Sequence, residues 1–425
     1  MKYVDMSREQ LLEQQEALKA EYAAFAAKGH KLDMSRGKPS PEQLELSAGL
    51  LDAVDSSTDF AAAAEVDVRN YGGLEGIEGA RRILGHMMGI PASNVIALNN
   101  SSLKIMYDLV AHAITHGIMG SIPWAKLDSV KFLCPSPGYD RHFSVCEHFG
   151  IEMVVVPMGE DGPDMDMVEE LVSSDESVKG IWCVPQYSNP QGYVYSDETV
   201  ARFAALKPAA SDFRIFWDNA YVLHHLYEDH PTVANIKDAC DAAGNPDIYY
   251  EFASTSKISF AGAGISGVGA SDANIADIKK FIFFSMICPD KINQLRHAIF
   301  FAEEGSLEAH MRKHAELIRP KFEMVESILS EQIGELGIGA WTSPRGGYFI
   351  CFDGLPGTAK RIVELAAEAG VKMTGAGAMY PYKRDPEDKT IRIAPTYPSV
   401  EDLRAAAELF SVCVKLASIE KLLEA

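Results

Sequence analysis

The sequence has no pair of cysteines at the C-x-x-C spacing of a zinc or dithiol site. Its 7 cysteines are scattered, and most of them lie within apolar runs. This pattern is typical of buried, reduced thiols in a cytoplasmic protein and not of a disulfide framework. We therefore expect a cytoplasmic location and no metal.

A long apolar run is also lacking. The first five residues, Met1 to Asp5, do not begin an apolar signal region. The most apolar stretch, near 281–288, is far too short to cross a bilayer. We expect no membrane partner.

Basic residues are scarce relative to acidic ones. The chain has 39 Lys and Arg against 60 Asp and Glu, which gives a formal net charge of −21. Such a balance argues against a nucleic-acid-binding or membrane-binding surface. An anionic ligand must then be held by a few local donors. At 425 residues the chain is also too long for one compact core, so two domains are expected.

Short apolar segments alternate with amphipathic ones over the first two thirds of the chain. Strands are expected at 94–98, 130–134, 151–157 and 180–185, with helices between them. This alternation predicts an α/β fold with a mostly parallel sheet covered by helices on both faces.

The pattern changes after Lys257. A glycine-rich strand at 261–269 is followed by a long polar helix at about 306–332, which Pro320 is expected to kink or break. Shorter strands and helices then indicate a smaller α+β unit, which the N-terminal helix joins. We expect a large domain at 50–305 and a small domain built from 1–49 and 306–425.

The central run, 213–257, contains two short apolar strands that each end in polar residues. Asp218 and Tyr221 follow the first strand, and Ser254 and Lys257 follow the second. Ligands bind beyond the carboxyl ends of parallel strands in such sheets. An amine that can form a Schiff base and a carboxylate that can hold a pyridine nitrogen protonated are the pair that pyridoxal phosphate (PLP) chemistry requires. Either piece alone could equally be a helix cap or a surface lysine.

Several short motifs in a fixed order indicate a family. They are Asn189-Pro190-Gln191-Gly192, Asp218-Asn219-Ala220-Tyr221, Ser254-Thr255-Ser256-Lys257 and Ile391-Arg392-Ile393-Ala394. Over nearly its full length the chain resembles the fold-type-I PLP-dependent aminotransferases, and among them the aspartate aminotransferase group. The branch is one related to the aminotransferase domain of MocR-type regulators. The resemblance implies a three-layer PLP-transferase fold with a mostly parallel central sheet and a smaller α+β domain.

The resemblance also implies the residues that hold the cofactor. Lys257 matches the Schiff-base lysine, which also moves the substrate proton. Asp218 matches the carboxylate on the pyridine nitrogen, and His142 supports that carboxylate from behind. Tyr139 matches the aromatic side chain that stacks on the ring. Tyr221 and Asn189 match the two groups that bind the ring oxygen.

The phosphate of the cofactor is expected to bind three serines, Ser101, Ser102 and Ser254. Tyr71 matches a tyrosine that reaches the phosphate from the neighbouring subunit, which implies a homodimer with shared active sites. The sequence departs from the family at two places. Gln191 stands where a threonine is usual, and Ile265 stands where an arginine usually binds the phosphate.

The expected substrates are an amino acid and a 2-oxo acid. Arg392 matches the arginine that grips the α-carboxylate, since a planar fork of donors suits a carboxylate. Gly37 matches a backbone donor to the same group. A dicarboxylic substrate needs a second cation, for which Arg141 is favoured while Arg36 and Lys291 stay open.

The resemblance favours an enzyme that converts L-aspartate and 2-oxoglutarate to oxaloacetate and L-glutamate with ping-pong kinetics. An aminotransferase for aromatic, branched-chain or 2-aminoadipate substrates is an alternative. A PLP-dependent lyase would use the same lysine and aspartate. A ligand-sensing regulator is disfavoured, because the chain starts with a single acidic helix and carries strong negative charge.

Overall fold

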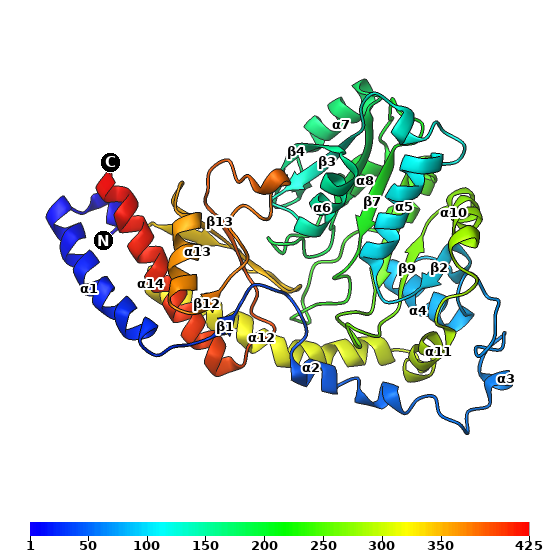
Figure 1. The fold of residues 1–425 in the computed structure, drawn as a ribbon, viewed down its shortest axis with the longest axis horizontal. Helices are drawn as coiled ribbons and strands as arrows, with labels where there is room; N and C mark the ends of the chain where they lie inside the picture. Colours follow the sequence, from blue (N-terminus) through cyan, green and yellow to red (C-terminus); the bar gives the residue numbers. More distant parts are fainter. Residues whose placement is uncertain (425) are drawn as a thin grey trace.

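A computed structural model describes residues 1–424 and is elongated, with both termini at one end (Figure 1). A large sheet has the strand order β2-β9-β8-β7-β6-β3-β4-β5. Its strands are β2 (Val95–Leu98), β3 (Lys131–Ser136), β4 (Glu152–Gly159), β5 (Gly162–Pro163), β6 (Val178–Cys183), β7 (Arg214–Asp218), β8 (Tyr249–Ser254) and β9 (Ser266–Gly269). The pairs from β4 through β3, β6 and β7 to β8 are parallel, whereas β2, β9 and β5 pair antiparallel. The mostly parallel α/β sheet predicted from the sequence is confirmed.

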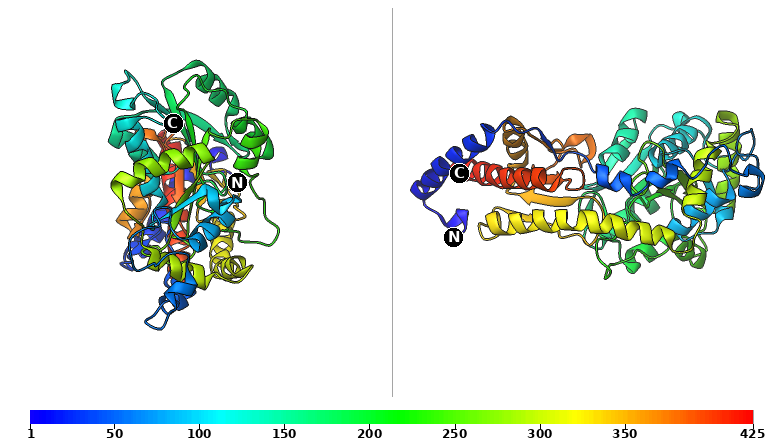
Figure 2. Two further views of the ribbon diagram at one scale, coloured as in Figure 1. Left: turned by 90° about the vertical axis from the view of Figure 1, so that its right-hand side faces the viewer. Right: turned by 90° about the horizontal axis from the view of Figure 1, so that it is seen from below.

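Helices cover both faces of this sheet (Figures 1 and 2). They are α4 (Glu78–Met88), α5 (Ser102–His116), α6 (Asp140–Phe149), α7 (Met165–Ser174), α8 (Asp197–Ala204), α9 (Ile236–Ala242), α10 (Asp272–Ser285) and α11 (Lys291–Phe300). Successive residues of β7 enter different cores, with Phe216 on one face and Ile215 and Trp217 on the other. A strand buried on both faces must be apolar throughout, which explains the continuous apolar runs of the central strands.

The C-terminal part of the chain forms a second unit with its own small sheets. The strands β10 (Gly339–Trp341), β11 (Ile350–Gly354) and β13 (Thr390–Ile393) pair antiparallel in that order. From the other end of the chain, β1 (Leu32–Asp33) pairs parallel with β12 (Val371–Lys372). The helices here are α1 (Arg8–Ala26), α13 (Ala359–Glu368) and α14 (Val400–Glu424), and α1 lies beside α14 (Figures 1 and 2).

A long helix, α12 (Ser306–Ile333), runs from the large sheet to the second unit (Figure 2). Of the kink or break expected at Pro320, the break is wrong: the helix continues on both sides of this residue. Ile318, Phe322 and Val325 are all buried in one core. Packing of this face holds both halves of the helix, and this outweighs the backbone hydrogen bond that proline removes.

Short elements complete the described chain. They are the helices α2 (Pro41–Glu45) and α3 (Phe60–Ala63) and the 3-10 turns Tyr3–Asp5, Ala48–Leu51, Ala92–Asn94, Trp124–Lys126 and Pro381–Lys383. Within residues 1–424, none of the helices combines the length and the apolar character that crossing a bilayer demands.

Candidate active site

The carboxyl ends of β7 and β8 bring an acid, a phenol and an amine together. Asp218 is the last residue of β7 and pairs with Phe252 of β8, and Lys257 follows shortly after β8 ends. The amine Nζ of Lys257 lies 4.7 Å from the centre of the Tyr221 ring. Burial lowers the pKa of Lys257, and the nearby negative charge of Asp218 opposes that shift. Burial thus shifts this amine toward its neutral form, which is the nucleophilic one.

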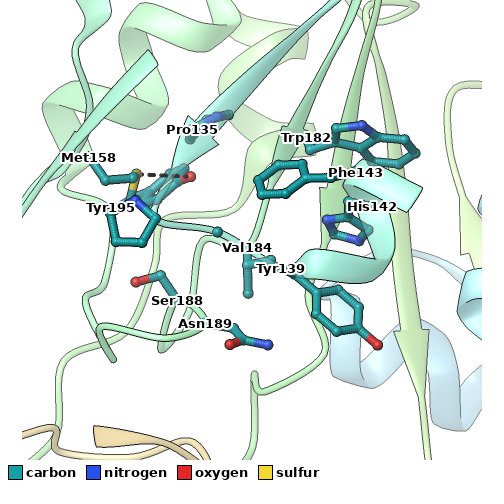
Figure 3. Close-up of a pocket in the computed structure, with 12 residues that line it drawn as sticks. Pro135, Tyr139, His142, Phe143, Met158, Trp182, Val184, Ser188, Asn189 and Tyr195 are labelled. Carbon is teal, nitrogen blue, oxygen red and sulfur yellow. Dashed lines mark hydrogen bonds between the residues drawn. The ribbon is translucent and has the colours of Figure 1, made fainter. Parts of the chain in front are cut away.

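Asp218 is buried, and its two oxygens have different surroundings. Oδ2 lies 3.0 Å from Nε2 of His142, whereas Oδ1 has no hydrogen-bond partner among residues 1–424. The His142 ring stacks on Trp182 with centroids 4.6 Å apart and planes 13° apart, as Figure 3 shows. This stacking fixes the orientation of the His142 ring. Because the ring contacts Asp218, it also fixes the orientation of that carboxylate.

The unpaired oxygen of Asp218 bears on which group the site can hold. A buried carboxylate oxygen without a partner is costly, so its natural complement is a ligand that donates a hydrogen bond. A protonated pyridine nitrogen is such a donor. Lys257, at the same sheet edge, supplies the amine for an aldehyde. The residues present thus fit PLP.

Two phenols flank this acid and amine. Burial and the charge of Asp218 raise the pKa of Tyr139 to about 12, and burial raises the pKa of Tyr221 well above its usual value. Both side chains are therefore protonated at neutral pH and can donate hydrogen bonds. The Tyr139 ring meets His142 edge-on, with centroids 4.9 Å apart (Figure 3).

Arg392, on β13, reaches this site from the second unit. Its Nη1 donates to Asn189 Oδ1 at 3.1 Å and to Asp140 Oδ1 at 3.3 Å. Its guanidinium also lies 4.6 Å from the ring centre of Phe349. A Cβ added to Gly37 would lie 2.4 Å from Cζ of that ring, so the glycine permits the packing.

Sequence reasoning missed the partners that hold Arg392. One of these partners is Asp140, to which Nη1 donates. The others are bound by Nη2, which donates to Thr374 Oγ1 at 3.2 Å and to the carbonyl of Ser35 at 3.4 Å. Asp140 and Ser35 lie more than 250 positions before Arg392 in the chain, whereas Thr374 lies only 18 before it. The Tyr139-Asp140 dipeptide could have flagged Asp140, but no local pattern marks Thr374 or Ser35.

The expected phosphate serines lie at the start of helix α5 and at the end of strand β8. Ser101 caps α5 by accepting from the backbone N–H of Lys104 at 3.2 Å, and Ser102 begins that helix. Ser254 Oγ lies 2.7 Å from Ser256 Oγ, which donates to the carbonyl of Asn100 at 2.8 Å. Ser256 thus joins the two segments and belongs with the candidate phosphate group. The Ser-x-Ser spacing before Lys257 was the available signal.

Ile265 is fully buried, and its backbone N–H donates to Thr255 Oγ1 at 2.9 Å. The apolar side chain therefore packs in a core where the family has a cation. The hydroxyls and the N-terminus of α5 are left as donors for an anion, which is the arrangement that helix termini favour.

The three candidates for a second substrate cation lie in different places. Arg141 is exposed and lines a cavity of about 370 Å³ together with Ser101. Arg36 is exposed on its loop. Lys291 is buried, and its amine donates to the carbonyls of Asn70 at 2.7 Å and Gly72 at 2.6 Å. These bonds turn its donors away from a substrate. Arg141 therefore stays the expected second cation.

Tyr71 is 77% exposed, and its backbone N–H donates to Oδ1 of the adjacent Asn70 at 2.8 Å. Its expected role at the phosphate of a neighbouring subunit stays a prediction.

Comparisons with known proteins show the family of the chain. The family model described as aspartate amino-transferase matches residues 6–425. An aspartate aminotransferase of Corynebacterium glutamicum is 47% identical over 95% of this chain and 94% of its own length. A crystal structure of an aspartate transaminase from the same species is 45% identical, covers 99% of both chains and has a TM-score of 0.95. An α-aminoadipate aminotransferase of Thermus thermophilus, complexed with N-(5'-phosphopyridoxyl)-L-leucine, is 17% identical over 99% of this chain and 96% of its own, with a TM-score of 0.74, which shows a shared fold alone.

Proposed function

The chain belongs to the aspartate aminotransferase family and is an aminotransferase, and from that premise we propose that it uses PLP to exchange an amino group between L-aspartate and 2-oxoglutarate. The products are oxaloacetate and L-glutamate. The observation that carries the proposal is the unpaired, buried Oδ1 of Asp218 at the same sheet edge as the amine of Lys257.

When bound, the cofactor supplies an aldehyde and an electron sink for the substrate carbanion. Lys257 holds the cofactor and then carries the proton to and from the substrate α-carbon. Its lowered pKa suits this work, because a general base acts best when part of it is neutral at working pH. Asp218, backed by His142, keeps the pyridine nitrogen protonated. Tyr221 and Asn189 bind the ring oxygen, and Tyr139 stacks on the ring.

Arg392 binds the α-carboxylate of the substrate. Asn189, Asp140 and Phe349 already hold its guanidinium in one orientation. A fork held in advance loses little entropy when it binds a planar carboxylate. Gly37 brings a backbone N–H to the same carboxylate, next to the ring that supports Arg392.

The phosphate binds Ser101, Ser102, Ser254 and Ser256, together with Tyr71 of the partner subunit in a homodimer.

The large domain spans 50–305, and 1–49 and 306–425 form the small domain that delivers Arg392. A cytoplasmic location accords with the cysteines, which form no disulfide within residues 1–424.

The proposal is tested by loading the purified protein with PLP and following its visible absorbance. L-Aspartate should bleach the band, and 2-oxoglutarate should restore it, with oxaloacetate and L-glutamate formed in equal amounts. A ping-pong rate pattern should follow. Turnover without any oxo acid would indicate a lyase. Faster turnover of an aromatic amino acid or 2-aminoadipate would replace the proposed substrate.

A substitution tests the second cation. Arg141→Ala should lower kcat/KM for L-aspartate roughly 100-fold, because a buried or half-buried carboxylate loses its charged partner. The kcat/KM for an apolar amino acid such as L-leucine should change less than about threefold. Arg404→Ala, at an exposed arginine on α14, is the matched control, and Arg36→Ala tests the alternative cation. Equal losses for both amino acids would remove Arg141 from the distal carboxylate.

A further inference from the structure

Lys291, the first residue of α11, donates hydrogen bonds from its amine to backbone carbonyls of a single loop, residues 67–72. Its side chain is 2% exposed, and Nζ lies 2.7 Å from the carbonyl of Asn70, 2.6 Å from that of Gly72 and 3.4 Å from that of Asp67. A lysine ammonium has three N–H donors, and three carbonyls surround it here. The two shorter bonds flank Tyr71 on either side in the chain.

The loop that Lys291 holds has local bonds at its start, where the backbone N–H of Asn70 donates to the carbonyl of Asp67 at 3.1 Å and Arg69 Nε donates to Asp67 Oδ1 at 2.9 Å. Gly72 and Gly73 have positive φ angles of 96° and 70°. A Cβ added to Gly73 would lie 3.3 Å from Cδ of Lys291, so the loop also rests on the lysine stem. Tyr71, between the bonded carbonyls, is 77% exposed and packs on little of its own chain. Its direction is therefore set by the backbone that the lysine grips.

The same turn of α11 is bonded to the chain segment that leads to the phosphate serines. The backbone N–H of Asp290 donates to Asn99 Oδ1 at 3.1 Å. Gln294 donates to the carbonyl of Ala97 at 3.0 Å and accepts from the backbone N–H of Ile77 at 2.9 Å. One helical turn thus holds both the Tyr71 loop and the end of β2 before Ser101.

We propose that Lys291 is a positioning residue for cofactor binding: by gripping the backbone at 67–72 it fixes the direction in which Tyr71 is presented to the PLP phosphate of the partner subunit. This rests on the proposed function, in which Tyr71 completes the neighbouring phosphate site. It also gives Lys291 a role in place of the substrate contact considered above, since its donors are already directed at carbonyl oxygens.

The test is PLP affinity of the cofactor-free dimer, measured by titration with absorbance or fluorescence detection. Lys291→Met keeps the length of the side chain but removes every donor. It should weaken PLP binding about tenfold or more, the scale of one hydrogen bond to a charged group. Lys321→Met is the matched control, because Lys321 is also buried and donates to two carbonyls, those of Thr396 and Pro398. It should leave PLP affinity unchanged.

A double-mutant cycle separates positioning from general loosening. If Lys291 acts through Tyr71, Lys291→Met should have little further effect on PLP affinity in a Tyr71→Phe background. Pyridoxal, which lacks the phosphate, should bind the wild type and Lys291→Met equally. Should Lys291→Met fold poorly, Lys291→Gln, which retains two donors, should give a smaller loss.

Other outcomes overturn the inference. A loss in Lys291→Met that persists in the Tyr71→Phe background would show that the loop acts without Tyr71. Unchanged PLP affinity with a raised KM for L-aspartate would make Lys291 a substrate cation. A wild-type protein that binds no PLP would instead refute the proposed function, so the two failures are distinguishable.

Discussion

Two buried regions of this molecule each centre on a lysine, and they use it in opposite ways. Lys291 is enclosed by backbone carbonyls that accept from its ammonium group. Lys257 is half-buried and faces the Tyr221 ring at 4.7 Å, with no hydrogen-bond acceptor among residues 1–424. Three carbonyls engage the donors of Lys291, whereas burial lowers the pKa of Lys257. The surroundings thus make one lysine structural and the other reactive.

The strongest test of this comparison is catalytic. Lys257→Ala should lower turnover of L-aspartate with 2-oxoglutarate at least about 10⁴-fold, because the proton carrier at the α-carbon is lost. Lys291→Met should retain most of its turnover when PLP is saturating. Both are measured as kcat in a coupled oxaloacetate assay.

Lys257→Arg sharpens this test, because it keeps a cation but cannot supply a neutral amine at working pH. It should be as inactive as Lys257→Ala. A loss below tenfold in either variant would mean that the reactive amine lies elsewhere.

Much of the fold could be predicted because local patterns determine it. The apolar runs that became β6, β7 and β8 are buried along their whole length, and the helices between them carry one apolar face. Asp218 and Lys257 could be placed at one sheet edge for the same reason, since parallel neighbours end together.

What the sequence concealed depends on contacts between distant residues. Lys291 bonds to carbonyls more than two hundred residues earlier, and backbone carbonyls leave no trace in residue identity. A break at Pro320, one of the two outcomes expected there, was wrong because the sequence does not show how strongly the buried face of α12 packs relative to the one hydrogen bond that proline removes. Ser256 needed the position of Asn100 to be recognised.

The smallest effects should appear in the stability of the cofactor-free protein, measured by urea unfolding near pH 7. Lys291→Met should lower the free energy of unfolding by about 2 kcal/mol, because buried carbonyls lose their donors. Lys321→Met should behave similarly. Lys257→Met should instead raise it by a smaller amount, since the native state no longer buries an amine without acceptors. An equal loss of stability in all three variants would mean that Lys257 stabilises the folded protein as Lys291 does.

The pH dependence gives this last prediction a sign that can be checked. Because the pKa of Lys257 is lowered in the folded protein, the unfolded chain binds more protons between that value and the ordinary 10.5, so wild-type stability rises with pH in this window relative to Lys257→Met. The advantage of Lys257→Met should be fully present below the folded pKa, shrink as the pH rises toward 10.5, and vanish only above 10.5, where the amine is neutral in both states. An advantage that stays constant over this range would mean that methionine stabilises by packing and that the amine of Lys257 is not held against its charge.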